Sequence, residues 1–184
     1  MVVTIFSDVL FTDVTSINGF PVTILKRHPE VCLRIAGDGP EKDDLKSRCV
    51  NLGISDHVHF LGAVKNDLLP ALYQTSNVVV FPSVIADDGD QEGFGLVLVE
   101  ALGCECAAVV TDLPALRDII IEGKTGLVVP QKSTKQLAEK VICLLDDPKN
   151  GESLGKKGRR HVKNHYDWDS ITIKYTTLIE SIAR

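Results

Sequence analysis

Two hydrophobic periods alternate along the chain, and this alternation constrains the fold more than any other feature of the sequence. Short runs with consecutive apolar or β-branched residues are typical of buried strands, and the segments between them carry apolar residues at helical spacing. The six expected strands are Val2–Phe6, Val31–Ala36, Val58–Leu61, Val78–Phe81, Ala107–Val110 and Gly126–Val129. The helices expected between them are Pro21–Lys26, Glu41–Leu52, Asp67–Thr75, Leu96–Gly103 and Leu113–Ile120.

Strands that are apolar on both faces and separated by helices predict a parallel sheet covered on both sides. We therefore expect an α/β fold with a doubly wound, Rossmann-like parallel sheet and right-handed crossovers. After Pro130 the pattern changes, and three helical segments follow with no strand between them: Thr134–Leu145, Glu152–Asn164 and Ser170–Ala183. A length of 184 residues suits one domain over 1–184, ending in a C-terminal helical tail.

The bulk properties exclude several classes of protein. A formal net charge of −5 argues against nucleic acid as a partner. No apolar run approaches the roughly 18 residues needed to cross a bilayer, and the start of the chain lacks a positively charged leader region, so we expect a cytoplasmic protein. One local exception is the basic cluster between Lys156 and Lys163. It predicts a solvated helix face or, alternatively, peripheral contact with an acidic membrane surface or a phosphorylated acceptor.

Cysteine and histidine residues give no sign of a metal or of a disulfide framework. The chain has five cysteines, an odd number, and no secretion signal accompanies them. Cys104 and Cys106 form a single Cys-x-Cys pair with no second pair or histidine cluster beside it. We expect no metal site and no cofactor.

Two glycine-containing loops resemble nucleotide motifs only in part. Gly37 and Gly39 match the first two positions of a Gly-x-Gly-x-x-Gly fingerprint, but Lys42 stands where the third glycine belongs, which favours a tight turn. The Gly123–Thr125 stretch resembles the end of a phosphate-binding loop. There Asp118 stands where the first glycine is needed and a strand is expected to follow, so this sequence does not indicate an NTPase.

A third loop carries more information. The polar stretch Asp87–Gln91 leads into Glu92-Gly93-Phe94-Gly95, which opens a helix of apolar residues. Unpaired N–H groups of Gly93, Phe94 and Gly95 at a helix N-terminus would form an anion site suited to a diphosphate.

Glu92 and Glu100 flank this helix start. Two carboxylates about two helical turns apart, roughly 12 Å at 1.5 Å per residue, can accept hydrogen bonds from opposite ends of one elongated ligand. The alternative is that Glu92 is a favourable first-turn acid and Glu100 a surface residue. Because Glu100 lies inside an apolar run, we expect it to need a partner.

The ordered set of motifs resembles the retaining glycosyltransferases of the two-domain GT-B type, in the large fourth sequence family. Glu92-Gly-Phe-Gly-x4-Glu100 matches the family signature, and the other motifs fall in family order. These are Arg34–Pro40, Val58–Gly62, Gly123–Leu127 and Tyr166-x-Trp168. The resemblance implies the nucleotide-sugar-binding half of such an enzyme, and the acidic loop is similar to those of bacterial exopolysaccharide transferases.

The resemblance also implies roles for individual residues. Glu92 would be the catalytic-site residue that contacts the donor sugar. Backbone groups of Gly93, Phe94, Gly95 and Leu96 would lie near the sugar hydroxyls and the diphosphate.

The nucleoside would bind on the other side of the same site. Glu100 would accept the ribose hydroxyls, the backbone from Gly62 to Val64 would meet the base, and Gly37 would lie beside it. No metal is implied, because this fold neutralises phosphate with helix dipoles and basic side chains.

The sequence departs from the family pattern in the segment after the first strand. Asp8 falls where the family has an arginine, Asn18 precedes Gly19 where a lysine is expected, and Asp13 adds a second acid. Acids facing a diphosphate would repel it. A pair of glycines usual after the fifth strand is also replaced, near Pro114.

Three hypotheses follow from these observations. The first is the donor half of a glycosyltransferase, which we expect to be inactive without an N-terminal acceptor-binding domain because catalysis needs both substrates positioned together. The second is a degenerate, non-catalytic binding module. The third is a related enzyme on the same fold, such as a sugar-nucleotide epimerase.

Overall fold

The computed structural model describes residues 1–6, 19–86 and 89–182. Asp8, Asp13 and Asn18, the departures from the family pattern, lie outside the described residues, as do two positions of the acidic loop. Six strands are present: β1 (Val2–Phe6), β2 (Cys32–Ala36), β3 (Val58–Gly62), β4 (Val78–Phe81), β5 (Ala107–Thr111) and β6 (Leu127–Val129). Each of them overlaps a strand expected from the sequence.

Helices connect the strands as expected. They are α1 (Phe20–Arg27), α2 (Lys42–Asn51), α3 (Leu69–Gln74), α4 (Leu96–Gly103) and α5 (Pro114–Ile119). Short 3-10 turns precede β3 (η2, Ser55–His57) and α3 (η3, Asn66–Leu68). The tail consists of α6 (Thr134–Asp146), α7 (Pro148–His165) and α8 (Trp168–Ile182).

The sheet has the order β3-β2-β1-β4-β5-β6, and each neighbouring pair of strands is parallel. The chain winds from β1 outward to β3, returns to the middle, and winds from β4 to β6. Ile5 of β1 pairs with Ile35 of β2 on one side and with Val80 of β4 on the other. The expected doubly wound, Rossmann-like fold is confirmed, and the strand order reverses between β1 and β4.

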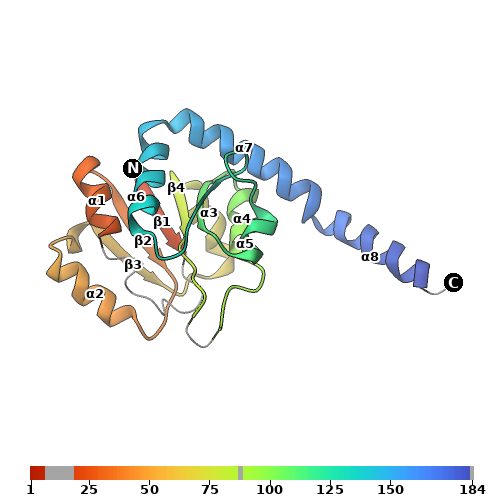
Figure 1. The fold of residues 1–184 in the computed structure, drawn as a ribbon, viewed down its shortest axis with the longest axis horizontal. Coiled ribbons are helices and arrows are strands. Elements are labelled where there is room, and N and C mark those ends of the chain that lie inside the picture. Colours follow the sequence, from red (N-terminus) through yellow and green to blue (C-terminus); the bar gives the residue numbers. More distant parts are fainter. Residues whose placement is uncertain (7–18, 87–88, 183–184) are drawn as a thin grey trace.

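Each face of the sheet has its own hydrophobic core because side chains alternate along a strand. Val78 and Val80 of β4 belong to the cluster that includes α1 and α6, whereas Val79 and Phe81 belong to the cluster with α3, α4 and α5. All four side chains are buried, which explains why β4 is apolar at every position. The helical layers lie on either side of the sheet in Figure 1.

Helix boundaries follow the local signals with one exception. Pro21 lies in the first turn of α1, and Gly53 follows α2 with a φ of +67°. Asp147 caps α7 by accepting the N–H of Asn150 at 3.1 Å. Thr134 resembles a capping residue in the sequence, but it is the first residue of α6 and Ser133 is the N-cap.

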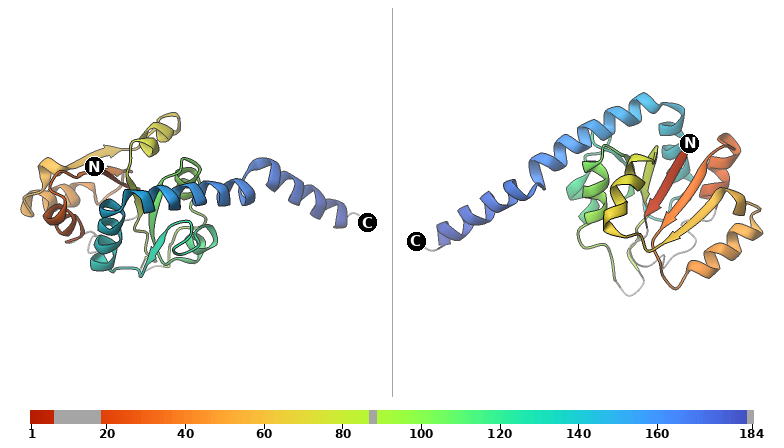
Figure 2. Two further views of the ribbon diagram at one scale, coloured as in Figure 1. Left: turned by 90° about the horizontal axis from the view of Figure 1, so that it is seen from above. Right: turned by 180° about the vertical axis from the view of Figure 1, so that it is seen from behind.

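The last two helices depart from the body of the domain. α7 runs across one side of the molecule, and α8 continues outward beyond it in both views of Figure 2. None of the residues from Trp168 to Ile182 is buried. Within the described ranges, we find no helix long and apolar enough to span a bilayer.

Candidate functional site

The carboxyl ends of the parallel strands form one edge of the sheet, and the loops of interest follow them. Ligands of such sheets bind at this edge, where the strand order reverses. Here that position lies between β1 and β4. The loop from Pro82 to Gly95 follows β4 and therefore borders it, with Gly37 after β2 and Gly62 at the end of β3 nearby along the same edge.

Glu92 accepts two backbone hydrogen bonds in the turn that leads into α4, whose N-cap residue is Gly95. The Oε1 atom of Glu92 accepts the N–H of Phe94 at 3.0 Å and the N–H of Gly95 at 2.8 Å. The expectation that the N–H groups of Phe94 and Gly95 are unpaired was wrong, because both donate to this carboxylate. An incoming anion would have to share or replace these two hydrogen bonds.

Gly95 sets the turn into α4, and only glycine fits there. Its φ is +84°, and a Cβ atom at this position would lie 2.9 Å from Cδ2 of Leu116 and 3.3 Å from Cδ1 of Ile119. The positive φ makes any other residue strained here, and a side chain would also require the ends of Leu116 and Ile119 to move.

Glu100 is exposed and not buried in the apolar run, because it lies on the outer face of α4. The hydroxyl of Tyr73, on α3, donates a hydrogen bond to its Oε2 atom at 3.1 Å. α4 begins at Leu96, so Glu92 lies before the helix and the spacing of 1.5 Å per residue does not apply between the two acids. Sequence reasoning missed Tyr73, a buried aromatic residue 27 positions away.

The loops after β2 and β3 are joined at the same edge. The N–H of Gly37 donates to the carbonyl of Gly62 at 2.9 Å. Above Gly62, the ammonium group of Lys42 lies 3.1 Å from the carboxylate of Asp38 and holds the pKa of that carboxyl below its usual value. Lys42, which breaks the dinucleotide fingerprint, thus contributes a cation at this edge. Val64, two residues after Gly62 in the chain, is half-exposed.

The side chain of Gln131 links the loop after β4 to the end of β5 through hydrogen bonds. Its side chain accepts the N–H of Ile85 at 3.0 Å and donates to the carbonyl of Asp112 at 2.9 Å. Asp112 in turn binds Arg117 through two hydrogen bonds of 2.6 and 2.8 Å, so the pKa of Asp112 is lowered and that of Arg117 raised. No local pattern indicates this role of Gln131, since its partners lie 19 and 46 positions away.

Two exposed apolar side chains border the turn. Phe94 is 45% exposed and Leu96 is 64% exposed, although both belong to the turn and helix start beside Glu92. Gly93, between Glu92 and Phe94, has open space around its Cα. The side chains of Phe94 and Leu96 and the backbone of Gly93 are therefore accessible to a ligand, whereas Gly95 is buried.

The other glycine-containing stretches have structural roles. Thr125 is buried, and its hydroxyl accepts the N–H of Ile121 at 2.8 Å, which closes the turn between α5 and β6. A strand, β6, follows this stretch as expected, where a phosphate-binding loop would lead into a helix. In the part of the chain that the structure describes, no group of three or more metal-binding side chains is found.

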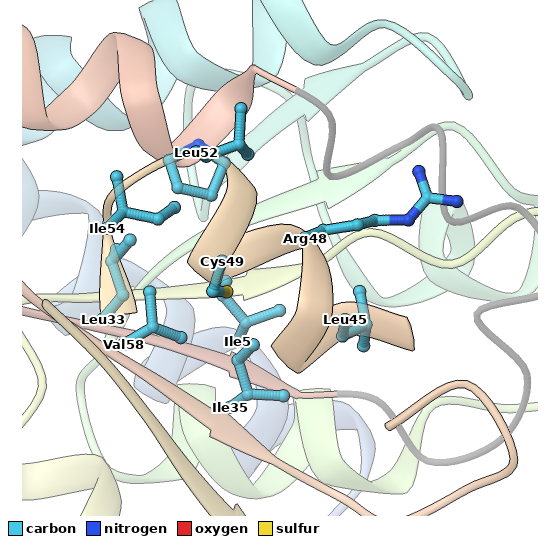
Figure 3. Close-up of a pocket in the computed structure, with 10 residues that line it drawn as sticks. Ile5, Leu33, Ile35, Leu45, Arg48, Cys49, Leu52, Ile54 and Val58 are labelled. Carbon is cyan, nitrogen blue, oxygen red and sulfur yellow. The ribbon is translucent and has the colours of Figure 1, made fainter. Parts of the chain in front are cut away.

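Two cavities lie away from this edge. An apolar one lies between α2 and the sheet, lined by Leu45, Cys49 and Ile54 among others, and has a volume of about 20 Å³ (Figure 3). That is room for about one water molecule, whereas ligand pockets measure about 300–1,000 Å³. A second cavity of about 230 Å³ lies beside Asn77 and Glu152, at the opposite, amino-terminal edge of the strands.

The fold and the site together define a class of protein. A doubly wound parallel sheet, with a carboxylate-flanked, glycine-rich helix start at its switch point, is the architecture of α/β domains in which nucleotide sites lie at this edge.

Comparison with known proteins gives the particular family. The family model described as "Glycosyl transferases group 1" matches residues 22–161. The chain belongs to this family, as the motifs indicated.

Individual relatives agree with this assignment. The GDP-mannose-dependent alpha-(1-6)-phosphatidylinositol monomannoside mannosyltransferase of Mycobacterium tuberculosis is 31% identical over 87% of this chain and 42% of its own length. The C-terminal domain of a group 1 glycosyl transferase (LpcC) from Francisella tularensis has a TM-score of 0.77, 23% identity and coverage of 90% of this chain and 86% of that one. Anabaena HepE, solved with UDP and glucose, has a TM-score of 0.82, 21% identity and coverage of 98% and 48%.

The chain is much shorter than its curated relatives. It matches 39% and 42% of the lengths of two of these relatives.

Proposed function

We propose that this chain is the donor-binding half of a retaining glycosyltransferase, which binds a nucleoside-diphosphate sugar for polysaccharide or glycoconjugate synthesis. One observation carries the proposal. Glu92 and the N–H groups of Phe94 and Gly95 meet at the N-terminus of α4, at the switch point of the sheet. This arrangement offers hydrogen-bond donors to a diphosphate and a carboxylate to a sugar hydroxyl.

The donor would lie along the carboxyl edge of the strands. The diphosphate would take the helix N-terminus and release Glu92 to the sugar, and Glu100 would accept the ribose hydroxyls. The base would lie against the backbone from Gly62 to Val64, beside Gly37. Tyr73 supports this arrangement because its hydroxyl donates a hydrogen bond to Oε2 of Glu100, and Oε1 could then accept a hydrogen bond from a ligand.

The partner of this half would be an N-terminal acceptor-binding domain. Support comes from the length of the relatives and from α8, which leaves the domain with Tyr175, Ile179 and Ile182 each more than 60% exposed. Transfer would require both halves, because the acceptor must be held against the donor sugar. We expect this chain alone to bind donor without transferring sugar.

The outer face of α7 supports peripheral contact with an acidic membrane surface. Lys157, Arg160 and Lys163 are exposed on it. Lys156 is paired with Glu152, so the basic cluster is only partly neutralised within the protein. Sedimentation of the chain with anionic and with neutral vesicles tests this contact, and equal binding to both would exclude it.

Calorimetric titration with UDP-, GDP- and ADP-sugars tests donor binding. We expect one nucleotide to bind, and Glu100→Ala to weaken it about tenfold, the effect of losing a charged hydrogen-bond acceptor. Glu139→Ala, at an exposed position of α6, is the matched control. If no sugar nucleotide binds, even with an N-terminal domain supplied, the proposal fails.

A binding module without donor affinity is the second candidate. The observation that favours it is the occupation of the helix N-terminus by Glu92. Sugar transfer after addition of an N-terminal domain would exclude this candidate.

A further inference from the structure

The ring of Phe94 packs against Tyr166, a residue at the C-terminal end of α7. Their ring centroids lie 5.9 Å apart with an interplanar angle of 61°, an edge-to-face arrangement. Phe94 belongs to the Glu92–Gly95 turn and has a glycine on each side. Because glycine backbones are conformationally permissive, side-chain contacts must hold this turn in one position.

Tyr166 is itself held at three points. Its hydroxyl donates to the carbonyl of Asp118 in α5 at 2.7 Å, and its N–H donates to the carbonyl of Val162 in α7 at 2.8 Å. Its ring also lies edge-on to His161, with centroids 6.3 Å apart. Tyr166 is therefore fixed to two helices before it meets Phe94.

We propose that Tyr166 is a positioning residue for the Glu92–Gly95 turn: by holding the ring of Phe94, it fixes the N–H groups of Phe94 and Gly95 that lie directly before α4. Its consequence for donor binding rests on the proposed function. Two surfaces then define the turn, since Gly95 packs on Leu116 and Ile119 of α5 while Phe94 packs on Tyr166.

A purely structural role for Tyr166 predicts a different behaviour. If the ring only filled the junction between α7 and α8, its removal would lower global stability and leave the turn unchanged in molecules that remain folded. A positioning role instead predicts local opening of the turn. The amides of Phe94 and Gly95 report this opening directly, because each is hydrogen-bonded to Glu92.

Hydrogen exchange of these two amides in the ligand-free chain tests the proposal. We expect Tyr166→Leu to accelerate their exchange about tenfold, which corresponds to about 1.4 kcal/mol. Tyr166→Phe keeps the ring and should stay within about threefold of the wild type. Tyr175→Leu, which removes an exposed tyrosine of α8, is the control and should have no effect.

A second variant keeps the test decisive if Tyr166→Leu does not fold. Phe94→Leu removes the same ring pair from its exposed side and should accelerate the Gly95 amide by a similar factor. Exchange at the wild-type rate in folded Tyr166→Leu, or in Phe94→Leu if the former does not fold, would overturn the proposal.

Addition of a sugar nucleotide separates this proposal from the proposed function. If the wild type binds one, Tyr166→Leu should bind it about tenfold more weakly, which corresponds to about 1.4 kcal/mol of binding free energy. The affinity of Tyr166→Phe should stay within about threefold of the wild type, a smaller difference. Unchanged affinity in the leucine variant would contradict the positioning role alone. Absence of binding by the wild type would contradict donor binding, while the exchange rates would still decide the role of Tyr166.

Discussion

Gly155 of α7 packs directly on the backbone of Glu105, so closely that a Cβ atom at position 155 would lie 1.9 Å from the Glu105 carbonyl oxygen. Glu105 itself has a φ of +64°, which is uncommon for a residue with a side chain. The contact brings α7 onto the turn between α4 and β5, at the end of α4 that lies opposite Glu92. The position of the tail therefore depends on the absence of a single methyl group.

Substitution of Gly155 by alanine should destabilise the domain strongly. The added methyl group meets backbone atoms that cannot rotate away, and we expect a loss of about 3 kcal/mol or more in the free energy of unfolding. Urea denaturation measures this loss. Gly103→Ala is the control, because no atom lies within 4 Å of a Cβ there, and it should change stability by less than about 1 kcal/mol.

Replacement of Glu92 by alanine should lower stability as well as function. Two N–H groups in the turn before α4 lose their acceptor, and the loss of such hydrogen bonds costs about 1 kcal/mol. Denaturant unfolding of Glu92→Ala beside Glu139→Ala measures this effect. Equal stability of the two variants would mean that Glu92 does not hold this turn in solution.

Much of the fold could be predicted from the sequence because each strand corresponds to a local run of apolar residues. β4 is apolar at every position since both faces of the sheet are covered, and glycine or proline marks several helix boundaries, as at Gly53 and Pro21. The alternation with helices predicted parallel strands joined by right-handed crossovers. The order β3-β2-β1-β4-β5-β6 is known only from the structure, because local pattern does not say which strands become neighbours.

The candidate site was predicted less completely, because its details depend on contacts between distant residues. Glu92 was expected beside unpaired N–H groups, but the turn lets its side chain fold back onto them. Tyr73 and Gln131 reach the site from segments whose local pattern shows only a helix or a loop. Their partners are specified by tertiary packing, which residue spacing does not encode.

The thiols should differ sharply in reactivity. Burial raises the pKa of Cys106 to about 12, and burial also raises that of Cys104, whereas Cys143 is exposed on α6. Because the thiolate is the reactive species, a thiol reagent near pH 8 should modify Cys143 first and Cys106 only after unfolding. Mass spectrometry of labelled peptides measures this order, and rapid labelling of Cys106 in the folded protein would contradict it.

Stability should fall in mild acid because of His161. Burial, and then the neighbouring His165 ring, lower the pKa of His161 below 6.5, and its Nε2 atom is buried without a hydrogen-bond partner among the described residues. The unfolded chain therefore binds a proton more readily than the folded one. The contribution of this histidine is present above about pH 6.5 and is lost progressively below it.

Urea midpoints at about pH 7.5 and about pH 5.5 measure this effect. His161→Gln should show a smaller decrease between the two conditions than the wild type. His59→Gln, on the exposed side of β3, serves as control and should keep the wild-type dependence. An unchanged decrease in His161→Gln would assign the acid sensitivity to other groups.

The position of donor binding tests the central claim most directly, and nitrogen-15 NMR of the chain during titration with UDP- and GDP-sugars measures it. We predict that the amides of Phe94, Gly95 and Leu96 shift with one of the two nucleotides, together with those from Gly62 to Val64. Residues around the cavity at the opposite edge, such as Asn77 and Glu152, should keep their positions. Shifts confined to that opposite edge, or no shift with either nucleotide, would contradict the account.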